Sequence, residues 1–270
     1  MASLALHGAT TQAAPPDANG GNQAMPHQVY ELRQYTLHPG KRDTLIALFE
    51  DRFIEPLESD GMQVLAHFRD LDNADRFVWF RRFDDMPARG RALPAFYRKN
   101  PIWQKYRTDA NATMRDSDNV LLLREAWPGS AFAAPTMRRP PVGAKPGSNA
   151  IVRVTPHALV NPVLDAFVGV FRHTLAPRAQ DAGARLLATF VSEESANNFP
   201  PLPVRPEHVL VWVASFPDAA AYARYRAHLE ADPRWSREVA PVLLQRLIWP
   251  ADVHRLAPAA RSLVQGHASD

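Results

Sequence analysis

The sequence predicts an α+β fold in which two tandem ferredoxin-like βαββαβ repeats form an intramolecular α+β barrel. Three observations support this prediction. The same order of strand and helix patterns occurs twice, short motifs recur at matching spacing, and a segment rich in proline, alanine and glycine separates the two copies. One such unit is a four-stranded antiparallel sheet with helices on one face. Its bare face must be buried, and two copies in one chain can bury these faces against each other.

The first copy, residues 28–128, shows the order of elements expected of one unit. The expected elements are a strand at 29–37, a helix at 41–60, strands at 62–72 and 76–83, a helical stretch at 87–114 and a strand at 119–127. The first helix has its apolar residues on one face and is followed by Gly61 as a stop signal. An Asp-Asn turn joins the two middle strands. The second helical stretch should break near Asn100–Pro101, because proline disrupts a helix interior.

The second copy, residues 149–252, repeats this order, with a strand at 150–159 and a helix at 161–181. Four features of the first copy recur in the second. Phe49 and Gly61 are 12 positions apart, as are Phe171 and Gly183, and Val78-Trp79 with Phe83 and Asp85 recurs at the same spacing as Val211-Trp212 with Phe216 and Asp218. Pro101-x-Trp103 recurs as Pro233-x-Trp235, and Trp127-Pro128 recurs as Trp249-Pro250. We interpret residues 1–27 as a disordered leader, 129–148 as a linker and 253–270 as a C-terminal tail.

Composition excludes several classes of protein. The chain has 270 residues, 46% of them hydrophobic and 22% charged, which is ordinary for a globular protein. No apolar run approaches the roughly 18 residues of a membrane span. The formal net charge is +3, and the arginines are scattered, so nothing indicates nucleic-acid binding. The absence of cysteine excludes disulfides and thiolate chemistry, and it is compatible with the cytoplasmic location that we expect.

Cofactor motifs are absent as well. The sequence has no Gly-x-Gly-x-x-Gly, phosphate loop, Gly-x-Ser-x-Gly or closely spaced histidine pair. The run Asp116-Ser117-Asp118-Asn119 lacks the spacing and distal glutamate of a calcium loop. We therefore expect neither a metal nor any other cofactor. A haem protein, with His38, His67 or His173 as axial ligand, is an alternative that no local motif supports.

Several runs resemble the NIPSNAP family. They are YELRQYTLHPGKRDTLIALFE, FVWFRRFDDMPARGRALPAFY and ANATMRDSDNVLLLR in the first copy, and NNFPPLPVR in the second. The resemblance covers nearly everything from Tyr30 to Trp249, apart from the linker. It implies the dimeric α+β barrel superfamily, whose other branches include antibiotic-biosynthesis-type monooxygenases, haem-degrading enzymes, isomerases and dehydratases. It implies no particular reaction, because the NIPSNAP branch lacks a well-defined shared activity.

Alternation along the strands of the first copy places polar side chains together on one face. These side chains are Glu31, Arg33 and Tyr35 in the first strand, Gln63 and His67 in the second, and Trp79 and Arg81 in the third. Because the helix-covered face should be the more uniformly apolar one, we expect this polar face to line the barrel interior. The second copy has Val152, Val154 and Leu187 in comparable strands, so a reactive pocket is expected mainly in the first half.

The copies differ in two loops, where further site residues are expected. Gly61 and Trp79 are 18 positions apart, whereas Gly183 and Trp212 are 29 apart, and the surplus is SEESANNFPPLPVRPEH. Trp103 to Trp127 spans 24 positions against 14 in the second copy, and that surplus includes ANATMRDSDN. The candidate ligand-binding residues are Glu31, Tyr35, Gln63 and Trp79 on the strands and Asp116, Asp118, Asn198 and Arg205 in these loops. Ordinary surface connections are the alternative for both loops.

Two functions remain open from the sequence. In the first, the barrel binds or transforms a small anionic metabolite, aromatic or enolisable, without a cofactor, as a monooxygenase, isomerase or lyase would. Arg33 and Arg81 would stabilise negative charge and His67 would move a proton. In the second, the chain is a non-catalytic ligand-binding or protein-interaction scaffold, in which Glu31 and Arg33 form a structural ion pair. The expected partner is a small molecule, not nucleic acid or a membrane, and a homodimer of tandem barrels is considered.

Overall fold

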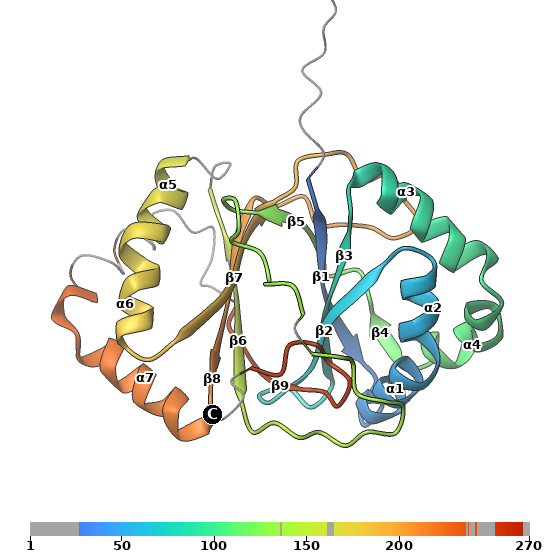
Figure 1. Ribbon diagram of the computed structural model, residues 1–270, viewed down its shortest axis with the longest axis horizontal. Coiled ribbons are helices and arrows are strands. Elements are labelled where there is room, and N and C mark those ends of the chain that lie inside the picture. The colour runs from blue at the N-terminus through green and yellow to red at the C-terminus, as the bar shows by residue number, and fades with distance from the viewer. Residues whose placement is uncertain are drawn as a thin grey trace, which may run out of the picture.

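The computed structural model describes residues 27–135, 137–160, 165–235, 237, 241 and 252–266. Eight strands close into an antiparallel barrel in the order β1, β3, β2, β9, β6, β8, β7, β5 and back to β1, and β4 pairs with the end of β1 (Figure 1). The strands are β1 (Val29–Leu37), β2 (Gln63–Asp70), β3 (Arg76–Phe83), β4 (Met114–Asp116), β5 (Val120–Glu125), β6 (Ile151–Ala158), β7 (Arg185–Ser192), β8 (Val209–Phe216) and β9 (His254–Pro258). The predicted mixed fold with a closed barrel is confirmed.

Helices cover the barrel on two opposite sides (Figure 1). Those of the first half are α1 (Arg42–Leu48), α2 (Ile54–Ser59), α3 (Met86–Pro94) and α4 (Pro101–Asn111), with π-helical turns at Phe49–Phe53 and Ala95–Lys99. Those of the second half are α5 (Asp165–Val170), α6 (Ala176–Asp181) and α7 (Ala219–Ala231), with a π-helical turn at Phe171–Leu175. The predicted break at Asn100 is present, and its side chain accepts a hydrogen bond from the Ile102 amide to begin α4.

The two halves share local details at matching positions. Each has a π-helical turn within its first helix, and each such helix is followed by a glycine with positive φ, Gly61 at 93° and Gly183 at 102°. The second strand of each half has a β-bulge, between Val64 and Ala66 in β2 and between Leu186 and Ala188 in β7. The Asp85 side chain caps α3 by accepting a hydrogen bond from the Ala88 amide, and the Asp218 side chain caps α7 in the same way by accepting from the Ala221 amide.

The C-terminal segment corrects one prediction. Residues 253–270 were expected to form a tail, but β9 at His254–Pro258 lies between β2 and β6 and joins the two halves of the barrel. The strand that the Trp249-Pro250 motif predicts falls at residues 242–251, outside the described residues, as does the predicted leader up to residue 26. Local patterns missed β9, because its five residues carry little apolar alternation and pair only with distant strands.

The expected linker at 129–148 packs against the barrel. The Ser130 hydroxyl donates to the carbonyl of Thr189 in β7 at 2.9 Å. The Arg139 guanidinium donates to the carbonyls of Val64 and Arg261, at 2.6 and 2.7 Å. This segment therefore contacts both halves of the molecule.

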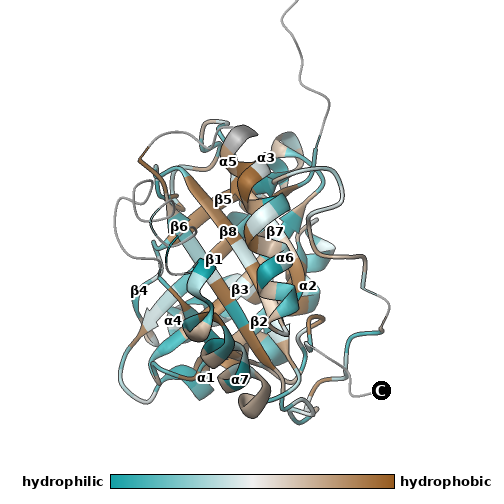
Figure 2. Ribbon diagram, turned by 90° about the vertical axis from the view of Figure 1, so that its left-hand side faces the viewer, coloured by the Kyte–Doolittle hydropathy of each residue, from teal (hydrophilic) through white to brown (hydrophobic). Residues whose placement is uncertain are grey.

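The barrel interior is largely apolar and contains side chains from both halves, together with a buried hydrogen bond between Gln34 and His254. Its buried residues are Tyr30, Leu32, Leu65, Ala66, Phe68, Val78, Phe80, Leu121, Leu123, Val152, Val154, Ala158, Ala188, Phe190, Val209, Val211, Val213 and Leu256. Figure 2 shows the apolar colouring of strands such as β8. An eight-stranded barrel is just wide enough for side chains to fill it. The interior therefore acts as the shared core of the two halves.

The prediction that the polar face lines the interior is therefore wrong. In β1, Tyr30 and Leu32 face the barrel core, whereas Tyr35 packs with the helices, on the face that alternation gives to Glu31 and Arg33 as well. In β3, Trp79 packs with the helices and Phe80 faces the core. The physical reason is that a narrow interior enclosed by eight strands leaves little room for charged groups and their partners, whereas the layer between sheet and helices accommodates them.

Candidate anion-binding site

A buried carboxylate holds three arginines beneath the helices of the first half. Glu31 in β1 accepts hydrogen bonds from Arg33 at 2.7 Å, Arg81 at 2.8 Å and Arg89 at 2.7 Å. All four side chains are at most 1% exposed. Arg33 and Arg81 are brought to Glu31 by strand geometry, since Glu31 pairs directly with Arg81 across β1 and β3. Arg89 approaches from α3.

This cluster carries an excess of positive charge. Burial would raise the pKa of Glu31, but Arg81, Arg33 and Arg89 together outweigh that effect and hold the pKa well below its usual range. Glu31 is therefore ionised at neutral pH. One negative charge against three guanidinium groups leaves two positive charges uncompensated within the cluster. Aromatic rings offset part of this cost, since the guanidinium carbons of Arg33 and Arg81 lie 5.7 and 5.3 Å from the Trp79 ring centroid.

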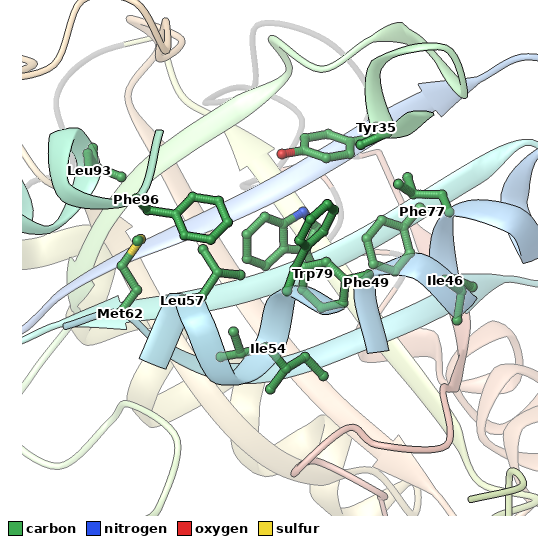
Figure 3. Close-up of a cluster of buried hydrophobic side chains, with 14 of the residues drawn as sticks. Tyr35, Ile46, Phe49, Ile54, Leu57, Met62, Phe77, Trp79, Leu93 and Phe96 are labelled. Carbon is green, nitrogen blue, oxygen red and sulfur yellow. The ribbon is translucent and has the colours of Figure 1, made fainter. Parts of the chain in front are cut away.

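A cavity of about 210 Å³ lies beside the cluster, between β1, β3 and the helices. Its wall is largely aromatic, and Figure 3 shows the rings of Tyr35, Phe49, Phe77, Trp79 and Phe96 gathered in this layer. The lining residues are Arg33, Tyr35, Leu45, Phe49, Phe53, Leu57, Phe77, Trp79, Phe96, Tyr97, Trp103, Ala110, Asn111, Met114, Ser117 and Leu202. The size and apolar wall suit a small organic molecule.

The polar groups at the cavity wall are mainly hydrogen-bond donors. The Tyr35 hydroxyl accepts from Arg33 at 2.8 Å, and the Tyr97 hydroxyl accepts from Arg81 at 3.2 Å, which leaves both phenol protons free to be donated. The Trp79 indole N–H has no hydrogen-bond partner in the described part of the chain. No carboxylate is among the described residues that line the cavity. Such a wall favours an anion or an acceptor-rich ligand.

The electrostatics keep Tyr35 neutral. Burial raises the pKa of its phenol, and Arg33 opposes that rise only in part. A neutral phenol whose oxygen already accepts from an arginine is a polarised donor. Tyr35 can therefore donate a hydrogen bond to an anion in the cavity without itself carrying charge.

The structure places His67 away from the cavity. The centroids of the His67 and Phe49 rings are 5.3 Å apart. Phe49 lines the cavity, whereas His67 is not among the lining residues. The Nε2 atom is bonded to Glu50 at 2.8 Å. Burial lowers the pKa of His67 despite the neighbouring Glu50. A catalytic role for His67 would thus require an arrangement in which Phe49 moves aside.

The β-bulge in β2 explains why Gln63 does not join the cluster. Strict alternation predicts that Gln63 and His67 share a face. The bulge between Val64 and Ala66 inserts one extra residue, so Val64 packs with the helices while His67 also faces them. Gln63 instead pairs with Arg82 at the end of the sheet.

The loop residues predicted to bind ligand have other contacts. Asp116 is exposed and closes a turn by accepting from the Asp118 amide, and their neighbour Ser117 lines the cavity instead. Arg205 binds Glu207 and Asn119. Asn198 accepts from Arg89 at 2.6 Å and so supports the cluster from outside the cavity.

Arg89 and Tyr97 are the site residues that the sequence did not reveal. Both come from the helical layer rather than from the strands. A signal for Arg89 exists, because it lies four and seven positions before Leu93 and Phe96 and so shares their buried helical face. A charge on an otherwise apolar helix face indicates a buried partner.

Among its described residues, the second half has no equivalent arginine cluster. Trp212 occupies the position of Trp79, but its indole N–H donates to His157 at 3.1 Å. Strand pairing places Ala214 where the first half has Arg81. Arg153 stacks over Trp212 and donates to Tyr225 at 2.7 Å. The asymmetry predicted from sequence is thus present among the described residues, and the arginine cluster with its donor-rich cavity wall belongs to the first half.

Acidification should destabilise the chain through His157. Burial and the nearby Arg153 lower the pKa of this imidazole to about 4. In the unfolded chain the imidazole has a pKa of about 6.5, so on acidification the unfolded chain binds this proton before the folded chain does. The free energy of unfolding therefore falls as the pH drops below ~6.5, and the loss reaches about 3 kcal/mol at pH 4. The variant His157→Gln should lose less stability over this range in urea unfolding. Parallel stability–pH curves for the variant and the wild type would contradict this assignment.

These observations define the class: an α+β barrel closed within one chain, with an electropositive cavity under one helix layer. Among solved structures, a proposed monooxygenase from Fusobacterium nucleatum matches with a TM-score of 0.55 and 9% identity, over 92% of this chain and 99% of its own. An anthrone oxidase-like protein matches with a TM-score of 0.53 and 10% identity, over 91% and 98%. These likenesses show that the chain shares the overall fold of these two proteins.

The structure matches also include the family that the sequence resembles. A NIPSNAP family protein of unknown function from Agrobacterium tumefaciens matches at 18% identity and a TM-score of 0.34, over 37% of this chain and 90% of its own. No family model and no curated protein matches the sequence. Within the described residues, no group of three potential metal ligands occurs, and no helix is long and apolar enough to cross a membrane.

Proposed function

We propose that the chain binds a small organic anion with an aromatic or otherwise apolar body in the first-half cavity. One observation carries this proposal. The described residues of the cavity wall include Arg33, the phenols of Tyr35 and Tyr97 and the unpartnered indole N–H of Trp79, but no carboxylate. The adjacent cluster holds one carboxylate and three guanidinium groups. A bound carboxylate, enolate or phenolate would compensate part of the excess charge. The aromatic wall would bury the rest of the molecule.

A catalytic version of this function follows from the same geometry. A substrate that enters the cavity already ionised, as an enolate or phenolate, would be stabilised by Arg33 and by donation from Tyr35 and Tyr97. Two structural matches bear the names of a proposed monooxygenase and an anthrone oxidase-like protein, which is in keeping with such substrates. We infer that any such reaction would be a cofactor-independent monooxygenation, isomerisation or lyase reaction. Arg33 would be its catalytic residue, supported by Arg81 from behind the wall, and His67 would take part only in an arrangement in which Phe49 moves aside.

The finer organisation is part of the same proposal. We infer that the two halves are tandem ferredoxin-like repeats, as their matching bulges, π-helical turns and capping aspartates support. The chain would work in the cytoplasm on a small molecule, as a single barrel or as a homodimer of barrels. A non-catalytic scaffold remains the second candidate, and it is favoured by the packed barrel interior.

Binding of benzoate, compared with its neutral isostere benzamide, tests the anion site. The wild type should bind benzoate more tightly in calorimetric titration. Replacing Arg33 by methionine should weaken benzoate binding about tenfold or more, since a hydrogen bond to a charged group contributes roughly 1.5–3 kcal/mol. Arg153→Met removes the stacked arginine of the second half and should leave binding unchanged. Equal affinity for acid and amide in the wild type would refute the proposal.

A further inference from the structure

A loop of the second half reaches across the molecule and packs on the helices of the first half. The loop comprises residues 193–208 and joins β7 to β8. Figure 1 shows it leaving the second half and running to α3. Leu202, near its middle, lines the cavity, whereas the other described lining residues belong to the first half. The second half thus contributes one wall residue to a site that it does not otherwise build.

The loop is anchored to the arginine cluster at its first end. Asn197 and Asn198 both accept from the same nitrogen of Arg89, at 3.0 and 2.6 Å. The Asn198 amide also donates to the carbonyl of Met86 at 2.6 Å. Gly90 is required for this approach, because a Cβ there would lie 2.8 Å from the Asn198 side-chain nitrogen. The loop position is therefore coupled to the residue that completes the three-arginine cluster.

The other end is anchored next to the strand that carries Arg33. The Arg205 amide donates to the carbonyl of Val120 at 2.8 Å, and Val120 pairs with Arg33 across β5 and β1. The Arg205 guanidinium donates to Asn119 at 3.0 Å. With both ends held, the segment between Phe199 and Val204 presents Leu202 to the cavity.

Between the anchors, the loop is built into the first-half core. Phe199 is 5% exposed, and its ring is stacked on that of Tyr97 at 6.3 Å between centroids. The guanidinium of Arg98 lies 5.2 Å from the same ring. Asn197 donates to the Leu202 carbonyl at 2.9 Å, which fixes the turn that presents Leu202. Leu202 is thereby held against the cavity by contacts that do not involve ligand.

We propose that Leu202 is the specificity-determining residue of this site and that it limits the bulk a ligand can carry beside its anionic group. This inference rests on the proposed anion-binding function. The loop is bonded to Arg89 of the cluster through Asn197 and Asn198, and Arg205 is bonded to Val120, the strand partner of Arg33, so we infer that Leu202 lies on the part of the wall nearest the arginines. Removing its side chain would open space for a second ring fused next to the carboxylate.

The experiment compares benzoate with 1-naphthoate, whose second ring lies beside the carboxylate. We expect Leu202→Ala to raise naphthoate affinity relative to benzoate by about tenfold, and Leu202→Trp to abolish binding of both acids. Leu229→Ala, a truncation of the same kind at a buried position of the second-half core, should leave the ratio unchanged. An unchanged ratio in Leu202→Ala, with benzoate still bound by the wild type, overturns the inference alone. Failure of the wild type to bind either acid overturns the proposed function and this inference with it.

The absence of cysteine from the chain allows a second, independent readout. Leu202→Cys introduces one thiol at the cavity wall. Saturating benzoate should slow its alkylation by iodoacetamide several-fold, and benzamide at the same concentration should not. Alkylation at the same rate with and without benzoate, in a variant that binds benzoate by calorimetry, would place residue 202 outside the ligand's reach and overturn the assignment.

Discussion

Replacing Glu31 by glutamine should destabilise the folded chain by roughly 3–5 kcal/mol, the cost typical of removing one partner from a buried ion pair. Glu31 is fully buried and accepts from Arg33, Arg81 and Arg89. Without its charge, three guanidinium groups remain in a small buried volume with no counter-ion. Their mutual repulsion and lost solvation then oppose folding.

Urea unfolding at neutral pH measures this effect. The matched control is Glu230→Gln, which neutralises a carboxylate paired with Arg226 on the surface of α7, where the glutamate side chain is 67% exposed. That exposed pair should contribute well under about 1 kcal/mol. A loss below about 1 kcal/mol for Glu31→Gln would mean that the arginines are not held by this carboxylate.

Truncating Phe190 to alanine should cost roughly 3–5 kcal/mol, as is typical of deleting a buried aromatic ring. Phe190 of β7 is fully buried in the barrel interior. Its ring lies 4.8 Å from that of Tyr30 and 6.0 Å from that of Phe80, both in the first half. The truncation would therefore leave a void at the contact between the two halves.

Chemical denaturation, in which unfolding of each half is followed by a spectroscopic signal from that half, checks this prediction. Phe190→Leu should cost less than Phe190→Ala, because it preserves more of the packed volume. Both variants should keep the relative affinity for benzoate over benzamide, since the cavity lies on the other side of the sheet. A near-neutral Phe190→Ala would contradict a filled barrel interior and reopen the interior as a binding site.

The fold could be predicted from sequence to the extent that it depends on local pattern. Apolar periodicity and glycine stops locate the helices before Gly61 and Gly183, and the proline rule locates the break at Asn100. Recurrence at fixed spacing predicts two similar halves. The strand β9 was missed because its pairing with β2 and β6 involves residues separated by a hundred positions or more. No local signal distinguishes such a strand from a tail.

The sequence predicted part of the residues that the structure brings together, but not their location. Alternation alone places Glu31, Arg33 and Tyr35 on one face, and cross-strand pairing brings Arg81 to them. The Glu31–Arg33 ion pair that we considered as the structural alternative is present, as part of a network within the first half. Which face is interior cannot be read from one strand, because both faces are covered in a barrel of this kind.

The sequence by itself determined the order of the elements, the likeness of the two halves and the grouping of charged residues on one strand face. All three follow from geometry that repeats over two to four residues. Only the tertiary structure decided that this face lies under the helices and that a bulge separates Gln63 from His67. It alone decided that Arg89 completes the arginine cluster and that Tyr97 and Leu202 line the cavity. The physical reason is that these outcomes depend on closing a barrel and packing distant segments, where the favourable contacts arise only after the chain has folded.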